Sequence, residues 1–357
     1  MNALPAIQAD LRLLSQNART ILDACRRHGV ELSVVTKAVC ADPHIARLLA
    51  SSGAASLADS RVENLRALPD SLPRLSLRVA DPAQAEELAL CAQQSLQSTP
   101  EAVLALGEAT RKLGRRHAVI LMADLGDLRE GVYHREERLL QDLAALTLSF
   151  PSLELLGVGA NLTCFGGILP DGDNLGRLVA LAEGLRRRFD VPLPLVSGGN
   201  SSSLHLLFEG RLPRGVNHLR VGEGLLLGMD TSSGKPFPHL SQHAFTLFAR
   251  LVEVYEKPSR PEGRTGPNAF GEAVSFPDLG PMRRGILAVG RQDTDEARLT
   301  PLDPGVRVLG ASSDHLLVDL TRAGQYTVGD TLGFTPGYGA LLRAYTSPYV
   351  RRVTAGD

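Results

Sequence analysis

The stretch Ser33-Val34-Val35-Thr36-Lys37-Ala38-Val39-Cys40 combines β-branched and apolar residues with one lysine near its end. Such a run is typical of a buried strand, and Asp42-Pro43 is a plausible helix start directly after it. A buried ammonium is costly unless it is exposed, paired or used chemically, and a neutral amine can attack a carbonyl to form a Schiff base. Lys37 is therefore either a side chain that reaches from a strand end into solvent or a reactive group.

The same succession of strand and helix continues to about residue 232. The clearest of these strands is Ala118–Asp124, and the last is His218–Val221. Such alternation predicts a parallel sheet, and about eight units of this length predict an α/β fold of the (β/α)8 TIM-like barrel type. An open doubly wound sheet is the competing interpretation, but no GxGxxG follows the first strand, which weakens its dinucleotide-binding form.

The sequence pattern changes after residue 232. Helical spacing fades, and short β-rich runs separated by proline and glycine take its place, with a long loop expected at Glu262–Gly280. We therefore expect two domains, a barrel over residues 1–232 and a small β-rich C-terminal domain over residues 233–357.

The composition argues against several classes of protein. A hydrophobic fraction of 43% and a charged fraction of 22% are ordinary for a globular protein. The net charge is −1 and no basic tract is present, so no nucleic-acid surface is expected, and no stretch is long and apolar enough for a membrane span. The cysteines form no CxxC pair and have no metal-ligand spacing, so we expect no metal site and reduced thiols in a cytoplasmic protein.

Polar or glycine-rich segments follow five of the predicted strands, at the end where a barrel carries its active site. The Ser197–Ser203 run suits a phosphate, because glycines let the backbone approach and because N–H groups and hydroxyls donate to an anion. Gly222–Gly224 would add donors. A phosphate beside a reactive lysine indicates pyridoxal 5′-phosphate (PLP). The five segments are Lys37, Asp124–Gly131, Asn161–Gly167, Ser197–Ser203 and Arg220–Gly224.

These segments, together with Asp59–Asn64 and three more in the C-terminal part, give the chain a resemblance over nearly its whole length. It resembles the alanine racemase-like, fold-type III PLP enzymes, and is most similar to their alanine/ornithine racemase branch. The resemblance implies a PLP-dependent isomerase that interconverts L- and D-amino acids in a homodimer with shared active sites. The matching segments are Val35–Lys37, Asp59–Asn64, Asp124–Gly131, Asn161–Gly167, Ser197–Ser203, Arg220–Glu223, Gly290–Asp293, Gly310–His315 and Tyr338–Arg343.

The same resemblance implies roles for single residues. Lys37 resembles the Schiff-base lysine and one catalytic base, and Arg129 the arginine near the phenolic oxygen. Arg220 is similar to the arginine that faces the pyridine nitrogen. Because an arginine stays charged, it keeps that nitrogen unprotonated, which disfavours transamination. Cofactor contacts are implied for Lys37, Asn161, Asn200, Ser201, Ser202, Arg220, Gly222, Glu223 and Tyr338. The structural alternatives are an ion pair at the barrel rim for Arg220, a core position for Tyr338 and a solvated helix start for Glu223.

Several positions differ from the alanine racemase pattern. Those enzymes carry a tyrosine base from the partner subunit in a Gly-Tyr-Ala-Asp motif, where this chain has Gly290-Arg291-Gln292-Asp293. Arginine is not a base at neutral pH. Ala41 and Met122 also replace a tyrosine and a carbamylated lysine of that pattern. We therefore do not expect alanine to be the main substrate. The candidates for the second base are Cys164, Asp293 and His315.

A basic amino acid such as ornithine would need a carboxylate for its distal ammonium. The candidates are Asp127, Asp293, Asp295 and Asp314. Two other functions are open: a fold-type III PLP decarboxylase or lyase, and a non-catalytic PLP-binding protein of cofactor homeostasis. The decarboxylases commonly carry a reactive cysteine in the β domain, and no cysteine follows Cys164. The β domain with its matching motifs argues against the non-catalytic protein, and loss of the tyrosine base argues for it.

Overall fold

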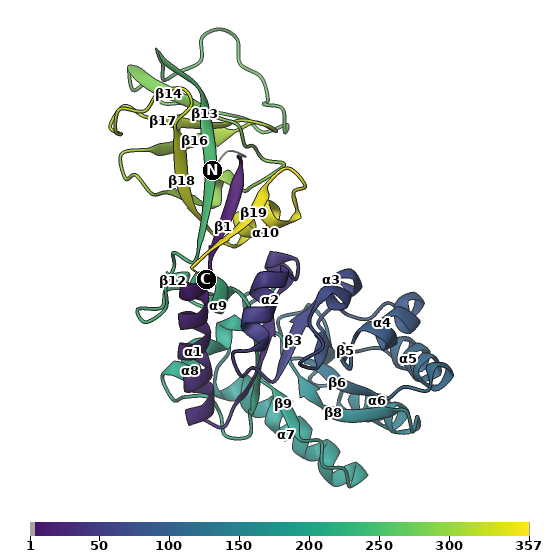
Figure 1. Cartoon of the computed structure of the whole chain (residues 1–357). Coiled ribbons are helices and arrows are strands. Elements are labelled where there is room, and N and C mark those ends of the chain that lie inside the picture. The colour runs from purple at the N-terminus through teal and green to yellow at the C-terminus, as the bar shows by residue number, and fades with distance from the viewer. Residues whose placement is uncertain (1–3, 357) are drawn as a thin grey trace. The chain divides into compact units, whose positions relative to one another are not determined.

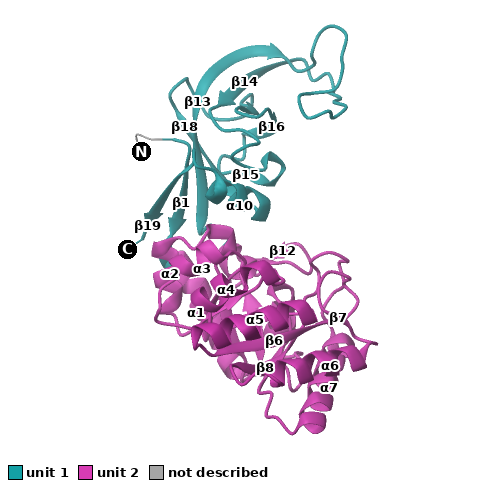
Figure 2. Ribbon diagram, turned by 90° about the vertical axis from the view of Figure 1, so that its right-hand side faces the viewer, with its two compact units in different colours: residues 1–12, 242–357 teal, residues 13–241 magenta. Residues whose placement is uncertain are grey.

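A computed structural model describes residues 4–356 and divides them into two units, which Figure 2 shows in different colours. The first unit contains residues 13–241 and is labelled unit 2 in Figure 2; the second combines residues 4–12 with residues 242–356 and is labelled unit 1 there. From the sequence we expected the boundary between residues 232 and 233, with the first residues of the chain belonging to the barrel. Strand β1 (Ala6–Asp10) instead pairs with β13 (Phe245–Pro258) and β19 (Arg351–Ala355) of the second unit. This pairing joins the two ends of the chain, so no local sequence pattern could reveal it.

Eight parallel strands within the described residues close into a barrel in the first unit (Figure 1). They pair in the order β5-β4-β3-β2-β10-β9-β8-β6, and the pairing of β5 with β6 closes the ring. The predicted (β/α)8 barrel is thereby confirmed, because an open doubly wound sheet would keep two free edges. The strands are β2 Glu31–Val35, β3 Ser56–Asp59, β4 Arg74–Ser76, β5 Gln94–Gln97, β6 His117–Asp124, β8 Leu153–Gly159, β9 Leu195–Ser197 and β10 His218–Val221.

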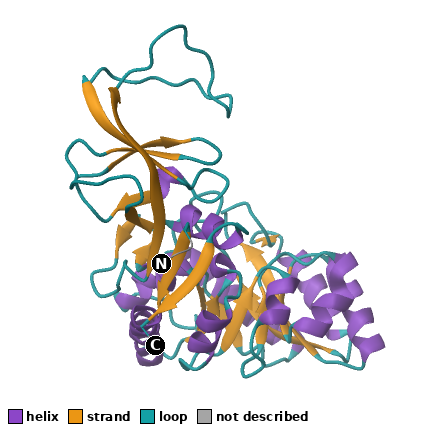
Figure 3. Ribbon diagram, turned by 45° about the horizontal axis from the view of Figure 1, so that its top comes forward, coloured by secondary structure: helices purple, strands orange, loops and turns teal. Residues whose placement is uncertain are grey.

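Helices surround the barrel strands (Figure 3), and each barrel strand is followed by a helix along the chain, with α1 preceding the first of them. The helix expected after the Lys37 stretch is present: Asp42 Oδ1 accepts the backbone N–H groups of His44 (3.0 Å) and Ile45 (3.2 Å), and Pro43 occupies the first turn. The helices are α1 Leu11–Arg27, α2 Pro43–Ala50, α3 Val62–Ala67, α4 Ala85–Cys91, α5 Pro100–Leu113, α6 Glu137–Leu148, α7 Gly172–Phe189, α8 Leu204–Phe208 and α9 Glu223–Leu227. Shorter elements are η1 Lys37–Val39, η2 Pro82–Gln84, η3 Ser201–Ser203, β7 Val132–Tyr133, β11 Met229–Asp230 and β12 Lys235–Pro236.

An apolar cluster fills part of the barrel core. Met122, at the position where the family pattern has a carbamylated lysine, is 1% exposed in this cluster. A methionine there packs without a polar partner, whereas a charged group would need one. The cluster contains Val35, Ala58, Leu75, Leu96, Ile120, Met122 and Leu195.

The second unit contains an antiparallel sheet in the order β15-β18-β13-β14-β17-β16, to which β1 and β19 are added. The expected long loop is present, because no helix or strand lies between the end of β13 and the start of β14. Helix α10 was not predicted from the sequence. These elements are β14 Pro281–Leu287, η4 Glu296–Arg298, β15 Leu299–Pro301, β16 Arg307–Ala311, β17 Leu316–Asp319, β18 Thr331–Pro336 and α10 Tyr338–Thr346. No helix in the described part of the chain is long and apolar enough to cross a membrane.

Candidate active site

Lys37 lies directly beyond the carboxyl end of β2, as the sequence predicted. It begins the short turn η1, and its side chain is half-buried. The preceding Thr36 holds this strand end against β3, since its Oγ1 donates to Asp59 Oδ2 at 2.8 Å. Cys40 (φ 47°) and Ala41 (φ 50°) then adopt the left-handed conformation, which turns the chain into α2. The lysine is therefore held at the end of the barrel where the strands terminate.

Arg220 on β10 is buried, with 2% of its surface exposed. Its Nη2 donates to Ala160 O and to Asn161 Oδ1, both at 2.7 Å, and its Nη1 donates to Ser197 Oγ. Burial lowers the pKa of Arg220 to about 10, so the guanidinium keeps its charge at neutral pH. The alternative of an ion pair at the rim is wrong, because these three acceptors are uncharged. They leave two of the five guanidinium N–H groups for a ligand.

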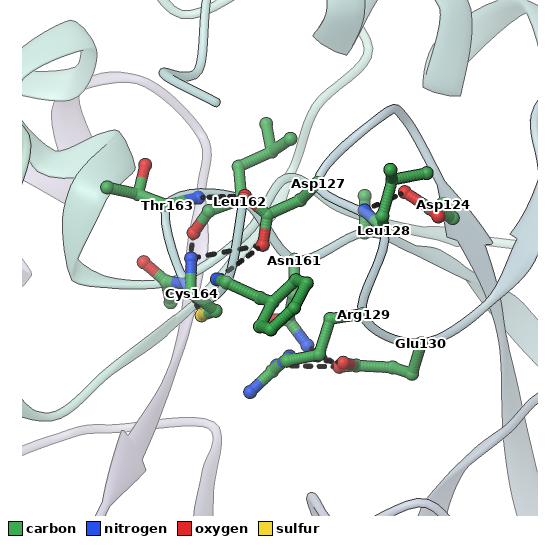
Figure 4. A network of polar contacts seen from close by, with 12 residues as sticks. Asp124, Asp127, Leu128, Arg129, Glu130, Asn161, Leu162, Thr163 and Cys164 are labelled. Carbon is green, nitrogen blue, oxygen red and sulfur yellow. Dashed lines mark hydrogen bonds and ion pairs between the residues drawn. The ribbon is translucent and has the colours of Figure 1, made fainter. Parts of the chain in front are cut away.

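Glu130 lies beside Arg129 (Figure 4) and is connected to Arg220 through Asn161. Its carboxylate forms an ion pair with Arg129 and accepts a hydrogen bond from Asn161 Nδ2. Asn161 in turn accepts from Arg220, so one carboxylate and one amide fix the positions of both guanidinium groups. Glu130 is 8% exposed and Arg129 39%. The sequence analysis did not single out Glu130, although its place beside Arg129 in a strand-end loop was a usable signal.

Asp127 joins the loops that follow β6 and β8. Its carboxylate is 1% exposed and accepts four backbone N–H groups, at distances from 2.9 to 3.2 Å, as Figure 4 shows in part. A carboxylate has about four acceptor positions, and all are used here. Asp127, a candidate from the sequence for binding a substrate ammonium, is therefore not available for that role. The donors are Thr163, Cys164, Phe165 and Ile168.

Cys164 lies on the loop that Asp127 holds. Its side chain is exposed, and its Sγ is 3.1 Å from Asn200 Nδ2. Although the residue is exposed, the protein atoms around its sulfur displace part of the water and raise the pKa of the Cys164 thiol, while the charges of Arg129 and Lys37 act in the opposite direction. The thiol is consequently protonated at neutral pH. Both positive charges lie close enough to the sulfur to influence it, which brings three predicted site residues together.

The Gly/Ser turn after β9 is hydrogen-bonded to the turn after β10. Asn200 shapes it, since its Oδ1 accepts from Ser202 N (2.8 Å) and its Nδ2 donates to Leu162 O (3.0 Å). Ser201 Oγ accepts from the backbone N–H groups of Gly222 (3.3 Å) and Gly224 (3.0 Å). Glu223 lies between these two glycines as the first residue of α9.

Ser202 Oγ is buried in this turn and has no hydrogen-bond partner within residues 4–356. A buried hydroxyl without a partner costs free energy that a bound acceptor would recover. A Cβ at Gly222 would lie 3.1 Å from the Cβ of Val35, so a side chain at this position would crowd the strand that leads to Lys37. An amine, a buried arginine and an unsatisfied hydroxyl in a glycine- and serine-rich turn fit a phosphorylated aldehyde.

The remaining candidates belong to the second unit. Tyr338 is half-buried at the start of α10. Asp293 is 4% exposed and its carboxylate accepts from Ser347 Oγ at 2.7 Å, which is the environment of a structural aspartate. The His315 side chain is exposed. Asp314 is also exposed, and it accepts from Gln292 Nε2.

Arg291, at the position of the family's tyrosine base, is engaged in its own unit. It forms ion pairs with Glu296 (2.6 Å) and Glu272 (2.9 Å), and its guanidinium lies 4.4 Å from the ring centroid of Phe270. Glu272 and Phe270 come from the long loop, so Arg291 fixes that loop to the sheet. No cluster of three or more metal-ligating side chains occurs in the part of the chain that the structure describes.

Comparisons with known proteins agree with this geometry. The family described as alanine racemase, N-terminal domain, matches residues 9–229. An ornithine racemase from Acetoanaerobium sticklandii is 41% identical over 350 residues, 98% of this chain and 99% of the relative. A lysine racemase from Thermotoga maritima is 36% identical over 352 residues, 98% of each. The structure of an alanine racemase from Streptomyces lavendulae has a TM-score of 0.78 at 19% identity, covering 100% of this chain and 98% of that one, which shows a common fold.

Proposed function

We propose, from the premise that this chain belongs to the alanine racemase family, that it racemises a basic amino acid, with ornithine as the first candidate and lysine as the second. The chain is an enzyme of the PLP-dependent type. The observation that carries the choice of substrate is the 41% identity to an ornithine racemase over nearly the full length of both chains. The replacement of the tyrosine base by Arg291 supports a substrate other than alanine.

The residues of the barrel would bind the cofactor and transfer the proton on one face of the substrate Cα. PLP, when bound, provides the aldehyde that captures the substrate amine and the electron-withdrawing ring that makes its Cα–H acidic. Ser201, Ser202 and the N–H groups after β10 would hold the phosphate, and Arg220 would donate to the ring nitrogen. The Lys37 amine would remove or return the Cα proton on one face. Because Arg220 stays charged, it does not deliver a proton to the ring.

Racemisation also needs a proton donor and acceptor on the opposite face of Cα. We propose His315 for this role. Its imidazole is exposed, whereas the carboxylate of Asp293 is buried and bonded to Ser347, and the thiol of Cys164 is held protonated by its raised pKa. His315→Gln should then retain exchange of the Cα proton while losing inversion, and unchanged racemisation by this variant would exclude His315.

We further propose that the enzyme is a cytoplasmic homodimer in which the second unit of one subunit completes the site of the other. The matching motifs in both units support shared sites. The unpaired state of Cys25, Cys40, Cys91 and Cys164 supports a reducing compartment. Sedimentation analysis of the purified protein tests the dimer, and a monomer with full activity would contradict it.

The function is tested by incubating the PLP-loaded protein with ornithine, lysine and alanine in deuterated water. NMR follows the loss of the Cα proton, and chiral chromatography follows the ratio of enantiomers. We expect exchange with inversion, fastest for ornithine. Exchange without inversion would indicate a one-base site that serves another Cα reaction, such as that of a decarboxylase or lyase. No exchange despite bound cofactor would indicate a PLP-binding protein without racemase activity.

A further inference from the structure

His218 is a buried titratable group that the reaction outlined above leaves unused. It lies on β10 two residues before Arg220, so both side chains face the same side of the strand, and it is 3% exposed. Its Nδ1 lies 2.6 Å from Ser197 Oγ and its Nε2 lies 2.7 Å from Ser33 Oγ. Both imidazole nitrogens are therefore bonded inside the barrel.

These bonds belong to a longer chain of polar groups that crosses four neighbouring strands. Ser33 Oγ is 2.6 Å from Ser56 Oγ on β3, and Ser197 Oγ accepts from Arg220. The strand register creates this arrangement, since Ser33 is the Cα partner of both Arg220 and Ser56, and His218 that of Ser197. The result is a continuous path Arg220–Ser197–His218–Ser33–Ser56 within one layer of the barrel interior.

Arginine limits the direction of this path, because a guanidinium only donates and Ser197 must accept from it. Ser197 accepts from Arg220, and it can pass its own proton only to His218 Nδ1 among its bonded neighbours. With the Ser197 proton directed at Nδ1, His218 would carry its own proton on Nε2 and donate it to Ser33, which would donate to Ser56. In this order each bond polarises the next in the same sense.

The imidazole is also neutral. Burial, and secondarily the charge of Arg220, lowers the pKa of His218 to about 3. A second positive charge next to Arg220 is therefore avoided, while the ring still fills the space beside the arginine.

We propose that His218 is a positioning residue, which acts through Ser197 to hold the Arg220 guanidinium in the orientation that presents its remaining N–H groups to the cofactor ring. This rests on the proposed function of Arg220. Of the three bonds that fix Arg220, two go to Ala160 and Asn161 on one side, and the bond to Ser197 is the one on Nη1. Without the bond from Nη1 to Ser197, the guanidinium can rotate about the end of its side chain, and its remaining N–H groups no longer point at the cofactor ring.

The test compares His218→Phe, which removes both bonds and keeps an aromatic ring, with His117→Phe as a matched control. His117 is the other strongly buried histidine of the barrel (2% exposed), and its Nε2 bonds to Ser95 Oγ at 2.9 Å, away from Arg220. We expect His218→Phe to lower kcat about tenfold or more, with KM within about twofold, because partners behind functional groups have effects of this size. We expect His117→Phe to leave kcat within about twofold. Equal loss of kcat in both variants would overturn the proposal.

Two further variants keep the test decisive if His218→Phe does not fold. Ser197→Ala cuts the link between His218 and Arg220 while keeping both side chains, and it should lower kcat in the same way. His218→Asn places an amide oxygen near the position of Nδ1 and should recover part of the loss. If Arg220 has its proposed role, a more mobile Arg220 should also increase the share of turnovers that end in transamination. The visible absorbance of the bound cofactor measures that share. Wild-type partitioning in Ser197→Ala would contradict the proposal.

A third readout does not depend on activity. Nitrogen-15 NMR of the histidine-labelled holoenzyme, assigned by loss of one signal in His218→Asn, should show His218 as a neutral ring with its proton on Nε2 around neutral pH. A proton on Nδ1 or a charged ring would refute the proposed path. The NMR experiment tests the hydrogen-bond path independently of the proposed function. If the wild-type protein fails to exchange the Cα proton of any amino acid, the racemase function is refuted, but the order of the hydrogen bonds is not.

Discussion

The carboxylate of Asp127 is expected to control the stability of the loop that carries Cys164. In Asp127→Asn, one oxygen is replaced by an amide NH2 group, which cannot accept a hydrogen bond. Oδ1 accepts from Thr163 and Ile168, and Oδ2 from Cys164 and Phe165, so two of the four bonds are lost whichever way the amide is oriented.

The magnitude follows from the type of bond. A hydrogen bond to a charged acceptor contributes about 1.5–3 kcal/mol, so two of them give about 3–6 kcal/mol. The loop is exposed, and water replaces part of what is lost. We therefore expect its opening to become easier by about 2–3 kcal/mol, or about 30- to 150-fold in its equilibrium constant.

Hydrogen exchange with mass spectrometry measures this opening directly. Peptides covering residues 161–169 should lose protection by the stated factor, while peptides from α5 and the second unit should keep theirs. Asp142→Asn, an exposed position on α6, is the matched control and should change nothing. Unchanged protection of residues 161–169 in Asp127→Asn would refute the view that these four bonds hold the loop.

Three other predictions concern the chemistry and the pH response. Lys37→Ala should abolish both the visible absorbance of lysine-bound cofactor and Cα exchange, and an unchanged spectrum would rule out the Schiff-base role. Burial lowers the pKa of His117 to about 4 and of His218 to about 3, from 6.5. The unfolded chain thus binds more protons than the folded one below pH 6.5, and stability should fall by up to about 2.7 kcal/mol per pH unit as the pH drops toward 4, as measured by urea unfolding followed by circular dichroism. His117→Asn should halve that slope, and an unaltered slope would show that His117 is not the cause. Arg291→Tyr removes the partner of Glu296 and should change the ratio of ornithine to alanine turnover. Wild-type kinetics for both substrates would place Arg291 outside the site.

Local pattern was enough for the barrel and for most of the residues now placed at its carboxyl-terminal end. The β-branched run before Lys37 and the start at Asp42-Pro43 act through backbone conformation and burial over a few residues, so their outcome was readable from the chain. The strand ends of a parallel barrel meet on one side, and this placed Lys37, Arg129 and Arg220 together before any distance was known.

Other features depended on contacts between distant residues, and only the tertiary structure decided them. The register of β10 against β2 and β9 brings His218 into one hydrogen-bonded path with three serines that are distant in sequence. The residues next to His218 in sequence do not predict this path. The sequence made Asp127 a candidate for binding a substrate ammonium, yet the fold places a second loop's N–H groups around it. Strand β1 belongs to the second unit because it pairs with β13 and β19. These partners lie more than two hundred residues away along the chain, so no local pattern could predict the pairing. Sequence by itself determined the elements and the end of the barrel that carries the chemistry, because those follow from local periodicity, whereas partner choice among buried polar groups required the long-range packing that the folded chain alone provides.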